Sequence, residues 1–161
     1  MKIQSKTLTL HSTSNDDAEL KSMFQDLETL SNMSEKNVRP IDIPSEITFR
    51  IEADNNLIGE IRIKNIKWYN RKAELSLMIE KSHRGKGYAT EALNNIIEYV
   101  FNTMNFYRLE AEVIDINAAS KRLVEKCGFI FEGRLREAKY VNGKYYDILR
   151  YGLLKKEWDM N

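Results

Sequence analysis

Cysteine, histidine and proline are scarce in this chain of 161 residues. Its one cysteine, Cys127, allows no internal disulfide and no cysteine-based zinc cluster. With only His11 and His83, a histidine-rich metal site is also excluded, so we expect no metal. No apolar run is long enough to cross a membrane. The opening residues, "MKIQSKTLTL", lack the apolar centre of a secretory signal, and we therefore expect a cytoplasmic protein.

Excess charge of either sign is also missing. Lysine and arginine total 25, and aspartate and glutamate total 24, which gives a formal net charge of +1. Nothing in this balance favours an anionic membrane, and no clustered basic stretch with interleaved aromatic residues favours nucleic acid. We expect neither as a partner. Apolar residues make up 42% of the chain, and its length suits a single domain over residues 1–161.

In the first half of the chain, the hydrophobic pattern mostly predicts strands. Thr7–Leu10 alternates like a short strand. The segment "STSNDD" offers N-caps for a helix of roughly 14 residues that ends near Leu30. Both prolines lie in Ser31–Glu46, which we interpret as a loop. Further strands are predicted at "ITFRIEA", "LIGEIRIKNI" and "KAELSLMIE", the first two as a hairpin around Asp54–Asn56.

In the second half, two helices alternate with strands. Apolar residues recur at helical spacing from Ala89 to Phe101, and "RLEAEVIDI" is the next strand. Asn117 is the predicted cap of a second helix that ends at Gly128. The "VNGK" segment is typical of a hairpin turn between two last strands. The whole order predicts an α/β fold with a mixed sheet and helices on its faces. The second helix should direct four side chains inward: Ala119, Leu123, Val124 and Cys127.

The densest chemical signal is "HRGKGYAT", between a predicted strand and a predicted helix. Free N–H groups at a helix N-terminus, two glycines without Cβ atoms, and the charges of Arg84 and Lys86 together suit a pyrophosphate. A P-loop is excluded because Lys86 is followed by Gly87 and no glycine lies five residues before Gly85. A dinucleotide fingerprint is excluded because Thr90 stands where its third glycine belongs. An ordinary tight turn with solvated charges is the remaining alternative.

The pattern Arg-x-x-Gly-x-Ala, at Arg84, Gly87 and Ala89, resembles the acetyl-CoA loop of the GNAT N-acetyltransferases. The segments "AELSLMIEKSHRGKGYATEAL", "NAASKRLVEKCGFIFEGRLREA" and "NGKYYDILRYGLLKKEW" are similar to the RimJ/RimL branch, which lies near the spermidine acetyltransferases. The resemblance covers roughly Ile58–Trp158. It implies a mostly antiparallel, splayed central sheet flanked by helices. It also implies transfer of an acetyl group from acetyl-CoA, as co-substrate, directly to a primary amine.

The resemblance also implies where acetyl-CoA is held. The splayed strand would pair with the pantetheine arm, the loop amides would hold the pyrophosphate, and Asn117 would contact the cofactor as well as cap its helix. The implied cofactor-binding residues are Leu77, Met78, Ile79, Arg84, Gly85, Lys86, Gly87, Tyr88, Ala89, Thr90 and Asn117.

For catalysis, the resemblance implies Glu74 as the base, acting directly or through a water. Ser120 is the candidate acid near the thioester sulfur. Many relatives carry a tyrosine for that role where this chain has Val124. Because a thiol has a pKa of about 8.5, its thiolate leaves readily and this loss has a small expected cost. The missing tyrosine also favours the alternative function, a non-catalytic acyl-CoA sensor or protein-interaction module.

The acceptor amine stays open between a protein or peptide N-terminus and a polyamine such as spermidine. The α-amino group, with a pKa of about 8, loses its proton more easily than an alkyl amine with a pKa near 10.4. Glu74 shares one face of its strand with Ser76, and Glu110 and Glu112 share a face of the next. If these faces meet, they form an acidic wall that attracts cationic amines. A homodimer is a possible assembly.

Overall fold

The computed structural model describes residues 2–4, 9–11, 44–54 and 56–160. The chain divides into two compact units, Met1–Val38 and Arg39–Asn161. In the first unit, β1 (Lys2–Gln4) pairs antiparallel with β2 (Thr9–His11). Strand β2 overlaps the strand predicted at residues 7–10, whereas β1 was not predicted. The predicted helix ending near residue 30, and residues 31–43 of the predicted loop, lie outside the described residues. The single domain over residues 1–161 stays a prediction.

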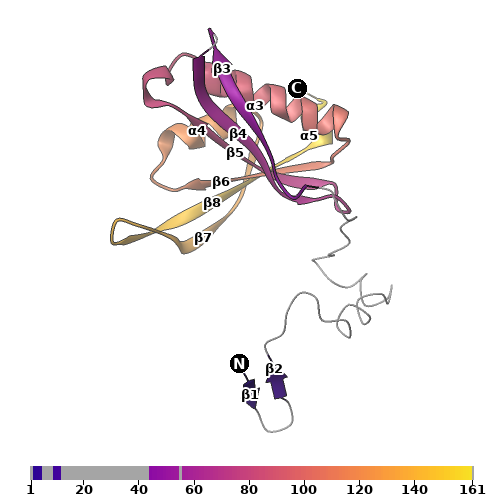
Figure 1. Cartoon of the computed structure of the whole chain (residues 1–161), viewed down its shortest axis with the longest axis vertical. Helices are drawn as coiled ribbons and strands as arrows, with labels where there is room; N and C mark the ends of the chain where they lie inside the picture. The colour runs from indigo at the N-terminus through magenta and orange to yellow at the C-terminus, as the bar shows by residue number, and fades with distance from the viewer. Residues whose placement is uncertain (1, 5–8, 12–43, 55, 161) are drawn as a thin grey trace. The chain divides into compact units, whose positions relative to one another are not determined.

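The second unit is built on a six-stranded sheet with the order β3-β4-β5-β6-β8-β7 (Figure 1). Its neighbouring strands pair antiparallel, except for the parallel pair β5 and β6. This confirms the predicted mixed, mostly antiparallel sheet. The strands are β3 (Ile47–Ala53), β4 (Asn56–Lys67), β5 (Lys72–Ile79), β6 (Arg108–Ile114), β7 (Ile130–Val141) and β8 (Lys144–Leu154).

The parallel pair opens into a fork. Its register runs from Lys72 opposite Arg108 to Leu75 opposite Ala111 and ends there. The rest of β5 continues beside β4 alone, with Ile79 opposite Gly59. Gly59 is required at that point, because a Cβ atom there would lie 2.2 Å from the carbonyl oxygen of residue 78. The splay expected of this strand is therefore present in the sheet.

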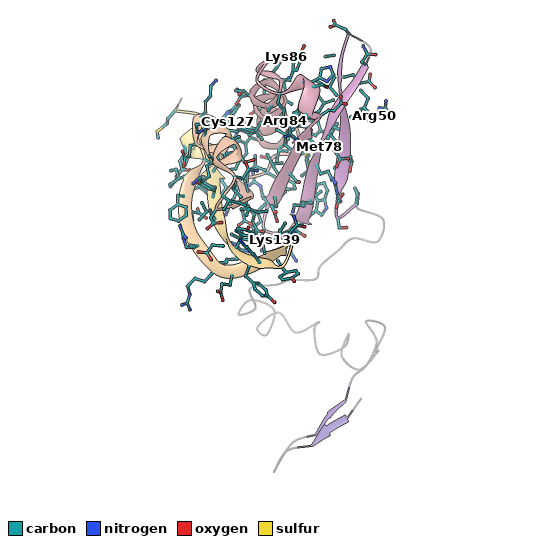
Figure 2. The ribbon with its side chains drawn as sticks, turned by 90° about the vertical axis from the view of Figure 1, so that its left-hand side faces the viewer. Arg50, Met78, Arg84, Lys86, Cys127 and Lys139 are labelled. Atoms are coloured by element: carbon teal, nitrogen blue, oxygen red, sulfur yellow. The ribbon has the colours of Figure 1, made fainter. Side chains whose placement is uncertain are left out.

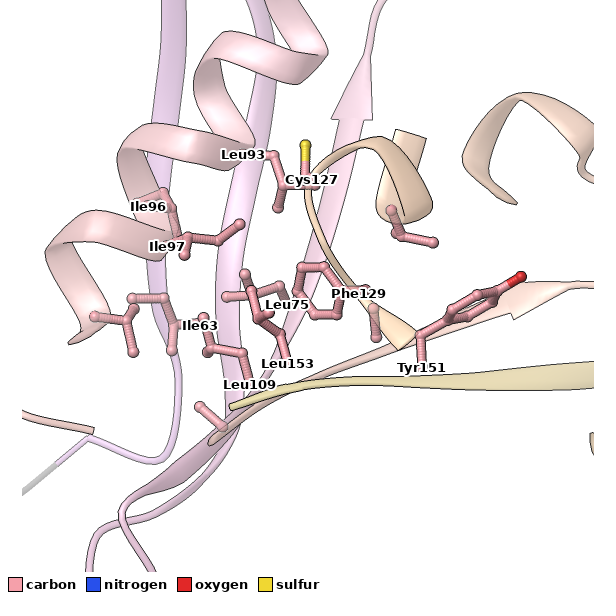
Figure 3. Close-up of a cluster of buried hydrophobic side chains, with 14 of the residues drawn as sticks. Ile63, Leu75, Leu93, Ile96, Ile97, Leu109, Cys127, Phe129, Tyr151 and Leu153 are labelled. Carbon is pink, nitrogen blue, oxygen red and sulfur yellow. The ribbon is translucent and has the colours of Figure 1, made fainter. Parts of the chain in front are cut away.

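Helices cover one face of the sheet and close the core. After the short helix η1 (Lys81–His83) come α3 (Tyr88–Glu98), which continues as the π-helical turn η2 (Tyr99–Thr103), then α4 (Ala118–Lys126) and α5 (Lys155–Trp158). Figure 3 shows Leu93, Ile96 and Ile97 of α3 directed toward Leu75 and other apolar side chains of the sheet. No helix in the described ranges is long and apolar enough to cross a membrane.

The ends of α4 form as the sequence predicts. The side chain of Asn117 caps the helix, and Gly128 follows it with φ of 88°. The N–H groups of Gly128 and Phe129 then donate to the carbonyl oxygens of Glu125 and Val124, which is the Schellman arrangement of a helix end. The inward placement was wrong for one residue: Ala119 is exposed, because the first turn of α4 borders an open cleft rather than the core. Val124 and Cys127 are buried, as predicted.

Strands β7 and β8 form the predicted hairpin. Asn142 and Gly143 have φ of 48° and 82°, and positive values at both central residues define a type I′ turn. Further along β7 the register shifts between Leu135 and Lys139, with Glu137 at φ of 52°. The Asp147 carboxylate accepts a hydrogen bond from the N–H of Glu137 and another from Arg134. Asp147 thus holds this bulge to β8.

Candidate active site

The glycine-rich loop leads directly into α3. Gly85 and Gly87 have φ of 76° and 89°, in the left-handed region that favours glycine, and Gly87 is the N-cap residue directly before the helix. A Cβ atom added at either glycine would meet no protein atom within 4 Å. It would project into open space in front of the loop. The two glycines therefore keep the loop backbone and the first N–H groups of α3 accessible from that side.

Arg84 ties the start of this loop to the end of β5. Its Nε atom donates to the carbonyl oxygen of Ile79 at 2.9 Å, and the backbone N–H of Arg84 bonds to Lys81 across η1. The charge of Arg84 therefore stands at the junction of strand and loop. Figure 2 shows Met78 and Arg84 on the same side of the unit, with Lys86 further out on the loop.

A cleft of about 810 Å³ lies between the splayed end of β5, this loop and α4. It brings together most of the residues predicted for the cofactor. Of that set, Lys86 does not line the cleft, and of the two catalytic candidates Ser120 lines it and Glu74 does not. The predicted residues on its wall are Leu77, Met78, Ile79, Arg84, Gly85, Gly87, Tyr88, Ala89, Thr90, Asn117 and Ser120.

Sequence reasoning missed a face of α4 that completes the cleft. Ala119, Arg122, Leu123 and Lys126 line it at helical spacing, and His83 lines it from η1. The spacing i, i+3, i+4, i+7 was visible in the sequence. The sequence instead assigns Ala119 and Leu123 to the inward side of the helix and Arg122 and Lys126 to its outward side, because nothing in it shows that the sheet opens beside this helix. Arg122 and Lys126 add two cations to a cleft that already contains Arg84.

Asn117 fixes the start of α4 at the cleft wall. Its Oδ1 atom accepts a hydrogen bond from the backbone N–H of Ser120 at 3.0 Å. The cap therefore determines where Ser120 stands. Val124, one turn further, is buried at 6% exposure and faces the core, so it contributes no polar group to the cleft.

Glu74 is the one buried charged side chain in the described part of the chain, with 8% of its surface exposed. Both of its carboxylate oxygens accept bonds. The Lys64 ammonium lies 2.7 Å from Oε1, and the Asn65 amide nitrogen lies 2.7 Å from Oε2. Consecutive strand residues normally face opposite sides, but the register shifts after Lys64 and Asn65 has φ of 51°. This bulge lets both side chains reach one carboxylate.

The prediction that these carboxylates form a negatively charged wall is wrong. Glu74 and Glu110 stand opposite each other in the β5–β6 register, so the carboxylates share a face as expected. Each of them has a cationic partner, however. Glu110 is bonded by Lys72 and Arg108 at 3.1 and 2.9 Å, and Glu112 by Arg150 at 3.0 Å. Arg108 also bonds Glu132.

Arg108 controls the titration of its neighbours. Partial burial acts to raise the pKa of Glu110, but hydrogen bonds from Arg108 and Lys72 outweigh it, so the pKa lies below its usual value. The hydrogen bond from Arg108 likewise lowers the pKa of Glu132. Elsewhere, burial raises the pKa of the Cys127 thiol, which suits the packing role predicted for it.

Comparison with known proteins identifies the family. Residues 8–149 match the sequence profile of the acetyltransferase (GNAT) domain. The spermidine N(1)-acetyltransferase of Vibrio cholerae is 33% identical over 136 residues, which cover 84% of this chain and 75% of that protein. The putative ribosomal N-acetyltransferase YdaF of Bacillus subtilis is 38% identical over 106 residues, which cover 66% of this chain and 58% of that protein.

Solved structures agree with the sequence comparison. A variant of the spermidine N-acetyltransferase SpeG from Vibrio cholerae superposes with a TM-score of 0.70 at 33% identity, covering 73% of this chain and 70% of that one. A probable acetyltransferase gives a TM-score of 0.69 at 36% identity, covering 71% and 64%. The chain therefore belongs to the GNAT N-acetyltransferases, enzymes that transfer an acetyl group from acetyl-CoA to an amine.

Proposed function

We propose that the cleft between β5, the glycine loop and α4 holds acetyl-CoA. The observation that carries this proposal is the meeting of two features in one cleft. The forked end of β5 supplies unpaired backbone, and the loop supplies helix N–H groups flanked by positive-φ glycines. The open space where their Cβ atoms would project leaves room for a pyrophosphate to approach the backbone. The cations Arg84, Arg122 and Lys126 on the cleft wall suit an anionic ligand.

Each part of the cleft has a proposed task. The backbone of residues 77–79 binds the pantetheine arm, which lies alongside it as an added strand would. The loop and first helical turn, residues 84–90, bind the pyrophosphate. Asn117 contacts the cofactor while it caps α4. Lys86, which stands outside the cleft wall, acts through its charge on the approaching phosphates rather than by direct contact.

In the reaction we propose, the acceptor arrives as an ammonium group and loses its proton before it attacks the acetyl carbonyl. Glu74, which stands one position before the end of the β5–β6 pairing, receives that proton directly or through a water. The amine nitrogen then forms the bond to the acetyl carbon, and the bond from that carbon to sulfur breaks. As the amide forms, the nitrogen loses its second proton, and Ser120 hydrogen-bonds the departing thiolate and relays that proton to it. No covalent enzyme intermediate is required.

We propose a primary amine as the acceptor, either the N-terminus of a protein or peptide, or a polyamine such as spermidine. Each class is supported by the name of one relative, since one is a spermidine acetyltransferase and another a putative ribosomal N-acetyltransferase. We also propose that the enzyme acts in the cytoplasm and as a homodimer. The apolar side chains Ile130 and Phe131, exposed on the edge strand β7, support a homodimer, and sedimentation of the full chain tests it.

Free-thiol release from acetyl-CoA tests the proposal. The panel contains spermidine, spermine, free amino acids, and peptides that begin with Ser, Ala or Asp, each at pH 7 and pH 9. Turnover with a primary amine, abolished when that amine is acetylated beforehand, is the expected result. Tight binding of acetyl-CoA without turnover by any amine would contradict it and favour a sensor of acyl-CoA.

A further inference from the structure

We propose that Lys64 selects the acceptor amine: its ammonium occupies Glu74 and so disfavours polyamines relative to amines that carry a single positive charge, such as a peptide N-terminus. This inference rests on the proposed function, because it assigns the acceptor class of the same site. It makes Lys64 a specificity-determining residue.

Lys64 stands where an incoming ammonium group would bind. Lys64 faces Glu74 across the β4–β5 register, and Glu74 faces Glu110 across the β5–β6 register. The three side chains therefore form a row that ends one residue before the fork. With Lys64 on one oxygen and Asn65 on the other, Glu74 has no oxygen without a donor. An acceptor ammonium that pairs with Glu74 therefore approaches a carboxylate whose charge the Lys64 ammonium already neutralises.

The burial of Glu74 strengthens the repulsion between Lys64 and an approaching polycation. Lys64 and Glu74 have 33% and 10% of their side-chain surfaces exposed, so water screens their attraction weakly. The Lys64 ammonium repels every charge of a polyamine that approaches Glu74. The α-amino group of a peptide brings one charge and has a lower pKa, near 8, so Lys64 repels it less and it gives its proton to Glu74 more easily.

Within the described part of this face, no other carboxylate substitutes for Glu74. The carboxylates of Glu110, Glu112 and Glu132 are each bonded by Lys72, Arg108 or Arg150. With Lys64 and Glu74 included, the described residues of this face thus comprise four carboxylates and four cations in contact with them. A polyamine needs surplus negative charge for its distal ammonium groups. A peptide backbone beyond its first residue is uncharged and has no such need.

The test is the ratio of kcat/KM for spermidine to kcat/KM for a Ser-initiated peptide with an amidated C-terminus. The Lys64→Met variant keeps the length of the side chain and removes its charge. We expect the ratio to rise about tenfold, because Glu74 becomes available to a substrate cation. The matched control is Lys144→Met, which removes the same charge from the exposed β7–β8 turn and should leave the ratio unchanged. An unchanged ratio in Lys64→Met, or an equal rise in both variants, would overturn the proposal.

A binding measurement separates this inference from the proposed function. If neither acceptor is turned over by the unaltered enzyme, the proposed acetyl transfer fails, and spermidine binding by calorimetry still tests Lys64. Tighter binding in Lys64→Met, reversed in the double variant Lys64→Met/Glu74→Gln, would support the occupation of Glu74. Equal binding in all three proteins would overturn it. Lys64→Gln serves in place of Lys64→Met should the latter not fold.

Discussion

The side chain of Asn117 and the backbone of Ser120 are joined by a hydrogen bond of 3.0 Å that begins helix α4. One bond therefore sets both the start of the helix and the position of a hydroxyl at the cleft. Replacing Asn117 with Ala should lower the free energy of unfolding by about 1 kcal/mol, the usual value of a side-chain cap. Urea unfolding measures this change.

Asn117→Ser separates the cap from any contact with the cofactor. Serine also caps helices well, so this variant should recover most of the stability lost in Asn117→Ala. Its affinity for acetyl-CoA should still be lower than that of the unaltered protein, because the amide is gone. Full recovery of both quantities would show that Asn117 acts only as a cap.

Ser120→Ala tests the leaving-group role. We expect kcat to fall on the order of tenfold, less than a typical general acid contributes, because the thiolate is already a fair leaving group. The Ser120 backbone N–H still bonds Asn117 in this variant, so stability and the KM for acetyl-CoA should hardly change. A kcat equal to that of the unaltered enzyme would remove Ser120 from the mechanism.

Glu74→Gln tests the base. The amide keeps an oxygen for hydrogen bonding but cannot accept the proton, and we expect kcat to fall by about a hundredfold at pH 7. Glu74 does not line the cleft, so affinity for acetyl-CoA should be retained. Glu112→Gln, which alters a carboxylate on the same face that pairs with Arg150, is the control and should retain activity. Similar losses in both variants would indicate a general effect of charge on this face.

Acid should destabilise the protein by weakening the ion pairs of Arg108 with Glu110 and Glu132. The pKa values of Glu110 and Glu132 are lowered in the folded state, so their contribution is present above the unfolded pKa of about 4.3. It is lost as pH falls through the lower folded values. We expect Arg108→Met to unfold more easily than the unaltered protein at pH 7, by about 1 kcal/mol or less, with a difference that shrinks below pH 4.

Urea midpoints at pH 7, 5, 4 and 3 measure this dependence. Arg50→Met is the matched control, since Arg50 pairs with Glu52 at an exposed position on β3 and should show little difference at any pH. A constant difference between Arg108→Met and the unaltered protein across this range would contradict the pKa assignment.

Local patterns predicted most of the described fold. The alternation in β3, β4 and β5, the 3.6-residue period of α3, and the turn at Asn142 and Gly143 are all signals within a few residues. Asn117 and Gly128 mark the ends of α4 for the same reason. The family resemblance supplied the splay of β5, which no local pattern shows.

Contacts between distant segments could not be predicted. Arg108 reaches Glu132 across 24 residues, and Arg150 reaches Glu112 across 38, so the neutralised face follows from strand order and register alone. The bulge at Asn65 is likewise a three-dimensional feature, because nothing in "RIKNIK" reveals that residues 64 and 65 converge on Glu74. Ala119 was assigned to the core because helical spacing identifies a face and not what lies opposite it.

The most direct test of the acetyl-CoA cleft is the affinity of Gly87→Val for acetyl-CoA, compared with that of Gly143→Val. Both glycines have positive φ, and a Cβ atom added at either would meet open space, so each variant should lose on the order of 1–3 kcal/mol of stability. Of the two, only Gly87 lines the cleft. We predict that calorimetry finds acetyl-CoA binding abolished in folded Gly87→Val and unchanged in Gly143→Val. Normal affinity in folded Gly87→Val would contradict the placement of acetyl-CoA in this cleft.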